Sequence, residues 1–103
     1  MDAAETDRRV LILAPEDNVC VACRDLEAGT ELLIDGAMVR LEQPVPTGHK
    51  LARRDIQQSE KILKYGAVIG SARQPIRAGQ YVHTHNLASD YIPTWDREGK
   101  EMR

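Results

Sequence analysis

Two of the three histidines of the chain stand one residue apart, in the stretch GQYVHTHN that begins at Gly79. If this glycine begins a strand, His83 and His85 share one face, with backbone positions about 6.5–7 Å apart. Two imidazoles at that spacing are a common way to present ligands to a divalent metal ion, and Asn86 adds an amide beside them. The alternative is a pair of polar side chains on a solvent-facing strand.

The third histidine lies in the stretch PTGHK. Gly48 allows a tight turn, so that His49 and Lys50 project from a loop, which is where binding groups usually sit on a rigid scaffold. A lysine beside a histidine offers a cation for a carboxylate substrate. A solvated turn that binds nothing explains the same residues equally well.

A second lysine lies in the stretch KYGAVIG, which starts at Lys64. Gly66 permits a bend or a close approach of the backbone. Lys64 could hold an anion, and the Tyr65 hydroxyl could donate a hydrogen bond to it, although a lysine in such a place is more often only solvated.

The two cysteines, Cys20 and Cys23, form a C-x-x-C motif inside a run that is typical of a strand. Residues three apart on a strand point to opposite faces, and no second cysteine pair completes a tetrahedral metal site. We therefore interpret them as two small apolar residues, in preference to a metal or redox role.

No complete catalytic set is visible in the sequence. It contains no Ser-His-Asp order, no phosphate-binding glycine loop and no carboxylates that frame a histidine. A domain with a few polar groups and no full machinery is what one subunit of a shared active site would look like.

The elements that must position these groups are short strands. The chain has 103 residues, few aromatic residues and a net charge of −2, so it forms one domain with a core of valine, isoleucine, leucine and alanine. Nothing in the charge predicts nucleic acid or an anionic membrane as a partner. The acidic start does not resemble a signal peptide, so we expect the cytoplasm.

The organisation that we expect is all-β. Residues 1–8 are expected to be disordered, residues 9–88 to form the domain, and residues 89–103 to form an irregular, extended tail. Short apolar runs predict strands over 9–13 and 18–26, and an Asp-Gly pair at 35–36 predicts a hairpin. Residues 51–73 alternate apolar pieces with glycines, which favours strands with bends over a helix.

One pattern recurs three times, as LEAGTEL, IQQSEKI and IRAGQYV. Gly29 and Gly79 are expected to adopt a positive φ in a turn just before a strand. Ser59 replaces glycine in the second copy, so we expect that turn to use another geometry.

Taken together, four stretches resemble a known family. EDNVCVACRDLEAGTEL, PTGHKLARRDI, KYGAVIG and IRAGQYVHTHN, in this order, resemble the N-terminal SAF domain of the altronate/galactarate dehydratases over about residues 14–87. The fold that the resemblance implies is the SAF-type β-clip. The same stretches are also similar to the small, alpha subunit of sulfolactate sulfo-lyase.

The resemblance implies a lyase that removes water from a sugar acid and gives a 2-keto-3-deoxy product. Four motifs of the family are carried over to this sequence. The sequence departs from the family at Ser59, Cys20 and Cys23, and these departures leave the polar residues of the motifs unchanged. Thr84 stands where sulfo-lyases tend to have valine, which favours the dehydratase. The motifs comprise Asp17, Asn18 and Val19; Gly48, His49 and Lys50; Lys64, Tyr65 and Gly66; and His83, His85 and Asn86.

From this resemblance and the residue types we expect specific roles. His83, His85 and Lys50 are the expected catalytic residues, and His83 and His85 are also the expected metal ligands. Fe²⁺ or another divalent metal is expected to be shared with a large subunit, which also supplies the base for the α-proton. The expected substrate contacts are His49, Lys64, Tyr65 and Asn86.

The expected partners are the large dehydratase subunit and its sugar-acid substrate, and this chain is expected to be the separate small subunit. Two other functions remain open: the alpha subunit of sulfolactate sulfo-lyase, and a SAF module that binds carbohydrate without catalysis. Apolar strand edges also allow a homo-oligomer.

Overall fold

The computed structural model of the chain describes residues 5–88, 94–95 and 101–102, and these form strands and turns with no helix. The all-β prediction is therefore confirmed. No helix in these ranges is long and apolar enough to cross a membrane. The strands are β1 (Val10–Leu11), β2 (Val19–Ala22), β3 (Glu31–Ile34), β4 (Ala37–Arg40), β5 (Lys50–Ala52), β6 (Lys61–Lys64), β7 (Ala67–Ala72), β8 (Tyr81–Val82), β9 (Leu87–Ala88), β10 (Thr94–Trp95) and β11 (Glu101–Met102).

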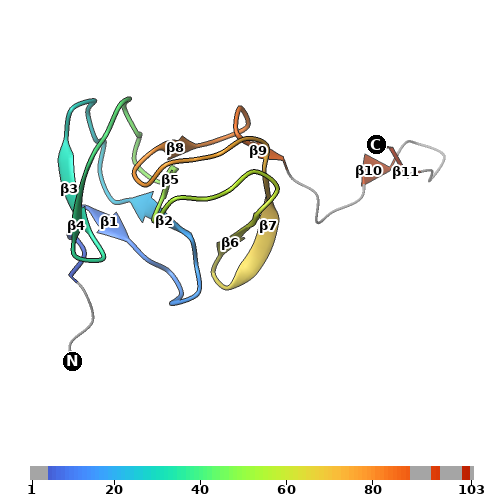
Figure 1. Cartoon of the computed structure of the whole chain (residues 1–103), viewed down its shortest axis with the longest axis horizontal. Helices are drawn as coiled ribbons and strands as arrows, with labels where there is room; N and C mark the ends of the chain where they lie inside the picture. The colour runs from blue at the N-terminus through green and yellow to red at the C-terminus, as the bar shows by residue number, and fades with distance from the viewer. Residues whose placement is uncertain (1–4, 89–93, 96–100, 103) are drawn as a thin grey trace.

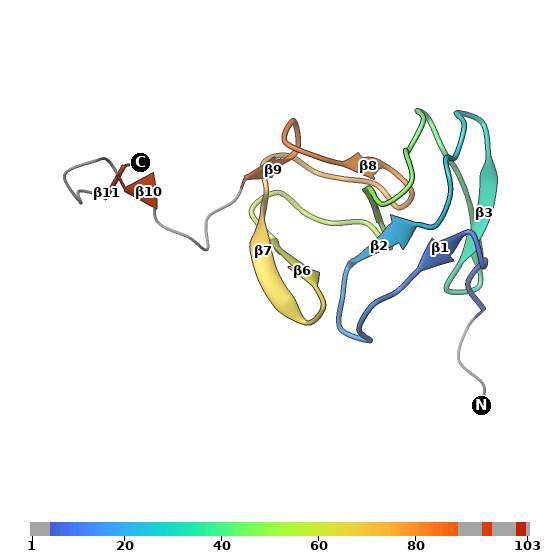
Figure 2. The same cartoon turned by 180° about the vertical axis from the view of Figure 1, so that it is seen from behind.

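A four-stranded antiparallel sheet in the order β1-β2-β5-β8 lies at the centre of the fold. The hairpin β3–β4 lies on one side of this sheet and the hairpin β6–β7, extended by β9, on the other (Figures 1 and 2). Lys50 on β5 pairs with Val21 on one neighbouring strand and Val82 on the other. This register brings the start of β5 beside the end of β8.

The hydrophobic core is divided by the central sheet into two clusters, because alternate residues of its strands point to opposite faces. The pair Cys20 and Leu51 belongs to one cluster and the pair Val19 and Ala52 to the other. The first core cluster comprises Val10, Cys20, Ala22, Leu26, Leu32, Ile34, Leu41, Val45 and Leu51. The second core cluster comprises Val19, Ala52, Ile56, Ile62, Ala72, Ile76 and Val82.

Both hairpins end in tight turns with two consecutive residues at positive φ. The predicted Asp-Gly hairpin is confirmed, with φ of 52° at Asp35 and 81° at Gly36. Tyr65 and Gly66 close the β6–β7 hairpin in the same way, with φ of 59° and 73°. Such turns match the twist of the strands they join, and glycine, asparagine and aspartate tolerate them best. Tyr65 has no such tolerance, so this turn needs support from elsewhere.

The recurrent pattern found in the sequence corresponds to a tight turn that leads into the next paired segment. Gly29 and Gly79 have φ of 87° and 84°, as expected. The expectation for Ser59 was wrong: its φ is 71°, so serine adopts the same left-handed geometry as the glycines. Its amide donates to the Ala72 carbonyl at 2.7 Å, and this bond holds the turn in place. The tight turn predicted at Gly48 has the same geometry, with φ of 82°, but its likeness to the three copies of the pattern was not recognised in the sequence.

The ends of the chain differ in part from the expectation. Residues 1–4 lie outside the described residues, but the expected disorder does not extend over residues 5–8. The Glu5 carbonyl accepts the Gly36 amide at 2.7 Å, and the Thr6 hydroxyl accepts the Asp35 amide at 3.0 Å. In the expected tail, β10 pairs with β11, and the remaining positions from 89 onward are outside the described residues.

Candidate functional site

The segment that carries His83 and His85 is a strand only as far as Val82. The predicted extended run through His85 was wrong, because residues 83–86 turn back on themselves. The His83 carbonyl accepts the amides of Asn86 at 3.0 Å and Leu87 at 2.8 Å. The turn lies between β8 and β9 (Figure 1).

Asn86 is the cause of this turn. Its side chain is fully buried, its Oδ1 accepts the His83 amide at 2.9 Å, and its Nδ2 donates to the Tyr81 carbonyl at 2.8 Å. A side-chain amide that bonds nearby backbone groups competes with strand pairing, and here it replaces the pairing. Asn86 was expected to contact substrate, but both ends of its amide hold the turn, so we place it as a positioning residue.

The three histidines converge on one aromatic ring, that of Tyr81. The rings of Tyr81 and His83 are stacked, with centroids 5.5 Å apart and planes 5° from parallel. The His85 ring lies 6.1 Å from Tyr81, and the His49 ring lies 5.7 Å from both Tyr81 and His83. Nδ1 of His49 and the Tyr81 hydroxyl form a hydrogen bond of 2.6 Å. We call these residues the imidazole cluster.

The pairing of β5 with β8 explains why His49 joins residues that are more than 30 positions away. Leu51 pairs with Tyr81 and Lys50 with Val82. One residue further in this register, His49, which directly precedes β5, lies opposite His83. Tyr81 and His83 are two residues apart and therefore share a face. His49 is half-buried, whereas His83 and His85 are exposed.

Tyr81 is the member of the cluster that the sequence did not reveal. Its position two residues before His83 was a usable signal, because a strand places such residues on one face. Its partnership with His49 depends on strand pairing between distant segments, which the sequence alone does not fix.

Lys50 is close to the imidazole cluster along the chain but lies on the other face of the central sheet. Lys50 follows His49 directly and pairs with Val82, which belongs to the second core cluster. Partial burial and, to a smaller extent, repulsion from Lys64 lower the pKa of the Lys50 ammonium. The structure therefore places the two predicted lysines within electrostatic reach of each other.

Tyr65 is not part of the imidazole cluster. It sits at the tip of the β6–β7 hairpin with 70% of its surface exposed. The neighbouring motif explains the strained turn: the buried carboxylate of Asp17 accepts the amides of Tyr65 at 2.8 Å and Gly66 at 2.7 Å. Its neighbour Asn18 donates to the Lys61 carbonyl and accepts the Leu63 amide, each at 2.8 Å. These two residues thus anchor the hairpin that carries Lys64.

A metal site does not assemble from this chain's own side chains. Within the described ranges, no three His, Cys, Asp or Glu side chains are placed to hold an ion. One nitrogen of His49 is already bonded to Tyr81. The cysteines are both free: Cys20 is buried in the first core cluster and Cys23 is exposed. The donor set that we describe therefore does not fit a metal without ligands from another chain.

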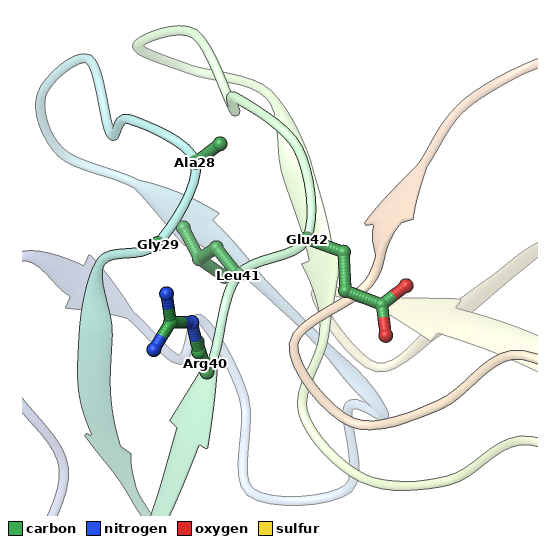
Figure 3. A pocket seen from close by; sticks show the side chains of 5 residues that line it. All are labelled: Ala28, Gly29, Arg40, Leu41 and Glu42. Atoms are coloured by element: carbon green, nitrogen blue, oxygen red, sulfur yellow. The ribbon is translucent and has the colours of Figure 1, made fainter.

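Two cavities open near the turns, away from the imidazole cluster. The larger has a volume of about 500 Å³ and is lined by Ala28, Gly29, Arg40, Leu41 and Glu42. In Figure 3 the Arg40 guanidinium lies below the Gly29 turn, and the Glu42 carboxylate points away from it. A second cavity, of about 180 Å³, shares Arg40 and Glu42 and reaches Arg77 and Gln80. Neither cavity is lined by a residue that the sequence predicted for catalysis, substrate binding or metal binding.

Comparison with known proteins gives this arrangement a family. The model of the altronate/galactarate dehydratase SAF domain matches residues 8–90, which is most of the chain. The chain belongs to this family. The predicted resemblance is therefore confirmed. The matched range is close to the range spanned by strands β1 to β9.

Curated relatives carry the names of lyases. The altronate dehydratase of Escherichia coli is 49% identical over 74 residues, which are 72% of this chain and 15% of the enzyme. The altronate dehydratase of Bacillus subtilis is 38% identical over 89 residues, covering 79% of this chain and 18% of the enzyme. The (2R)-sulfolactate sulfo-lyase subunit alpha of Chromohalobacter salexigens is 45% identical over 47 residues, which cover 46% of this chain and half of that subunit.

The extent of these matches limits what they show. The chain spans less than a fifth of the altronate dehydratases that it matches. What the relatives share with this chain is the SAF domain of dehydratase and lyase enzymes. The activity of a whole enzyme is a separate question.

Proposed function

We propose that this SAF domain is the small subunit of a sugar-acid dehydratase and completes an active site with a large catalytic chain. The observation that carries the proposal is the convergence of His49, His83 and His85 on Tyr81. Polar groups of a kind that can transfer protons gather at one place, in a domain whose relatives are named altronate and galactarate dehydratase. A complete catalytic set is not needed if the large chain supplies the rest.

The chemistry that we propose is the elimination of water from an aldonic or aldaric acid. A base on the large chain removes the proton α to the carboxylate, the hydroxyl group on the next carbon leaves as water, and the resulting enol becomes the 2-keto-3-deoxy acid. Departure of the hydroxyl needs a proton donor, and histidine suits that role near neutral pH. His83 and His85 are the groups that we assign to it.

The lysines are proposed as contacts for negative charge. Removal of an α-proton pushes charge onto the carboxylate, and a fixed cation stabilises that charge. Lys50 follows His49 in the chain but lies on the other face of the central sheet, and Lys64, in the anchored β6–β7 hairpin, is within electrostatic reach of Lys50. A substrate held by both a lysine and a histidine would therefore have to reach around the start of β5. A carboxylate contact strengthens binding of the substrate, whereas a proton donor accelerates the chemical step.

This division of roles gives the experiment that tests the proposal. The chain is co-expressed with a large dehydratase chain encoded in the same genome, and the purified assembly is supplied with altronate or galactarate. His83→Ala or His85→Ala is expected to lower kcat by about 10²–10⁴-fold. Lys50→Met is expected to raise KM by about 10–100-fold, which corresponds to loss of a charged hydrogen bond. Gln74→Ala, an exposed change in another loop, is the matched control.

The outcomes are distinct. Release of a 2-keto-3-deoxy acid that requires both chains and fails in the histidine variants supports the proposal. Full activity of the large chain alone, or histidine variants that match Gln74→Ala, would show that this domain does not take part in the reaction.

The metal is a separate part of the proposal. The resemblance implies Fe²⁺ or another divalent ion, and we propose that the large chain provides most of its ligands, with His83 or His85 completing the set. Treatment of the assembly with a chelator is expected to abolish activity, and Fe²⁺ is expected to restore it. The isolated small chain is expected to bind no stoichiometric iron, which metal analysis after dialysis would show.

A second candidate function is the alpha subunit of a sulfolactate sulfo-lyase. One observation favours it: the match to the Chromohalobacter subunit, at 45% identity, covers half of that subunit, whereas the matches to the altronate dehydratases cover less than a fifth of those enzymes. Supplying the same assembly with sulfolactate distinguishes the two. Release of sulfite, with no keto acid formed from altronate or galactarate, would favour the sulfo-lyase.

A further inference from the structure

On the basis of the proposed function, we infer that Tyr81 is the positioning residue of the site and holds His49 as a hydrogen-bond donor for an oxygen of the substrate. Tyr81 contacts each of the three imidazoles, with ring centroids within 6.1 Å. Its ring packs against the first core cluster, so its position is set by the fold. The hydroxyl group reaches Nδ1 of His49 at 2.6 Å.

The direction of that hydrogen bond follows from the chemistry of the two groups. A phenol hydroxyl is a stronger acid than an imidazole N–H, and a neutral imidazole nitrogen is a stronger base than a phenol oxygen. The stable arrangement has the Tyr81 hydroxyl donating to Nδ1 of His49. The imidazole hydrogen is then on Nε2, because a neutral ring carries one hydrogen.

This tautomer decides what His49 can bind. With Nδ1 occupied by the phenol and Nε2 bearing hydrogen, neither nitrogen has a lone pair free for a metal ion. Nε2–H is instead a donor for a carboxylate or hydroxyl oxygen, the groups that a sugar acid presents. His49 is therefore a contact for substrate oxygen. His83 and His85 contact the Tyr81 ring, and His83 also the His49 ring, but their own ring nitrogens form no hydrogen bond among the described residues.

The two parts of Tyr81 act on different histidines. The hydroxyl is bonded to His49, whereas the ring stacks on His83 and lies beside His85. Tyr81→Phe removes the hydroxyl and keeps the ring, and Tyr81→Leu removes both. Tyr65→Phe is the matched control, because Tyr65 is on the exposed hairpin tip and outside the cluster.

The test is histidine ¹⁵N nuclear magnetic resonance of the full 103-residue chain at an alkaline pH, where free imidazole is neutral. We expect the native His49 ring to carry hydrogen on Nε2. In Tyr81→Phe the His49 Nδ1 signal should move toward that of a nitrogen without a hydrogen bond, while the His83 and His85 signals stay in place. Tyr81→Leu should shift all three, and Tyr65→Phe none.

Hydrogen on Nδ1 of His49 in the native chain would overturn the inference. So would a His49 signal that Tyr81→Phe leaves unmoved. If Tyr81→Leu does not fold, Tyr81→Phe still decides, because it keeps the ring that packs on the core.

The assembly with the large chain separates this inference from the proposed function. There, Tyr81→Phe is expected to weaken substrate binding through the misplaced His49 donor, with KM rising about 10-fold while kcat changes less. If no substrate is turned over by any assembly but the resonance pattern holds, the positioning by Tyr81 stands and the dehydratase proposal fails. If turnover is normal and the resonance pattern fails, the dehydratase proposal stands and the positioning by Tyr81 fails.

Discussion

The two cysteines show how differently side chains three residues apart behave in this fold. Cys20 is buried in the first core cluster, and burial raises the pKa of its thiol to about 12. Cys23 is exposed after the end of β2. The interpretation of the C-x-x-C motif as two separate residues is consistent with both being free.

This contrast predicts selective alkylation. The thiolate is the form of cysteine that reacts, so the raised pKa of Cys20 and its burial both protect it from alkylation. Iodoacetamide is therefore expected to label Cys23 and leave Cys20 intact until the chain is unfolded, as followed by mass spectrometry. Cys23→Ser should show no labelling in the native state. Equal rates at both positions would contradict the burial of Cys20.

Asp7 gives the prediction for pH. Arg9 donates to both carboxylate oxygens, at 2.9 and 2.6 Å, and these hydrogen bonds hold the pKa of Asp7 well below its usual range. A lowered pKa stabilises the fold above the unfolded value of about 3.9, and this contribution is lost as the pH falls below it. For a partly exposed ion pair we expect about 0.5–1 kcal/mol.

Asp7→Asn is accordingly expected to lower the free energy of unfolding at pH 7 and to make it less sensitive to acid than in the native chain. Urea unfolding at several pH values between neutrality and strong acid measures both. Glu27→Gln is the control, because Glu27 is exposed and its side chain forms no hydrogen bond or ion pair among the described residues. An unchanged acid dependence in Asp7→Asn would show that the pair with Arg9 does not stabilise the fold.

At the scale of elements, one turn geometry is used four times with different sequences. Gly29, Gly48, Ser59 and Gly79 all have φ between 71° and 87°. The pattern of apolar and small residues marked the turns at Gly29, Ser59 and Gly79, and it predicted the positive φ at the two glycines. The expectation of another geometry at Ser59 was wrong, because the left-handed geometry there is held by the hydrogen bond to Ala72 on β7, not by the residue type.

Two of these glycines allow a matched test. A Cβ atom added at Gly48 meets nothing within 4 Å, whereas at Gly79 it meets Val39 Cγ2 at 3.1 Å. Gly48→Ala is expected to cost only the left-handed conformation, about 1–2 kcal/mol. Gly79→Ala should cost about 1 kcal/mol or more beyond that, because Val39 must move. Thermal unfolding of both variants measures the difference, and equal losses would contradict the close approach of the Gly79 turn to β4.

The sequence predicted those elements whose geometry depends on residues that are neighbours in the chain. The Asp35-Gly36 hairpin was predicted because both residues tolerate positive φ. The second hairpin was interpreted as a bend, since Tyr65 does not tolerate that geometry and the supporting carboxylate of Asp17 is 48 positions away. The strand through His85 was wrong for a similar reason: alternation favours a strand, but the buried amide of Asn86 closes a turn there.

At the scale of the whole molecule, the two core clusters share one sheet. Leu32 and Ile62 belong to different clusters and are both fully buried. Strands β2 and β5 contribute side chains to both clusters, so neither cluster can lose its packing without disturbing the strands that support the other.

Leu32→Ala and Ile62→Ala are therefore expected to lower the free energy of unfolding by about 2–5 kcal/mol each. Both variants should still unfold in one transition, with circular dichroism and tyrosine fluorescence coinciding. An exposed change of the same kind, Leu11→Ala, should cost much less, since half of that side chain is already in solvent. Separate transitions in either core variant would show that the clusters unfold independently.

The sequence predicted which histidines belong to the candidate site, but it did not predict how they are arranged. The residue types at positions 49, 83 and 85 marked all three histidines, and the structure brings them together. The sequence did not separate the lysines from them, because the faces of β5 are defined only once its partners are known. It also missed Tyr81, whose role arises from the pairing of β5 with β8.

The exposure of His83 and His85 has a consequence for how such a site must operate. Imidazoles at a protein surface stay hydrated, and water weakens their electrostatic interaction with any bound anion. An elimination that generates charge on a carboxylate benefits from a dry enclosure. Under the proposed function, the large chain would supply that enclosure by covering the β8–β9 turn, so that docking of this chain and dehydration of the imidazoles would be a single event.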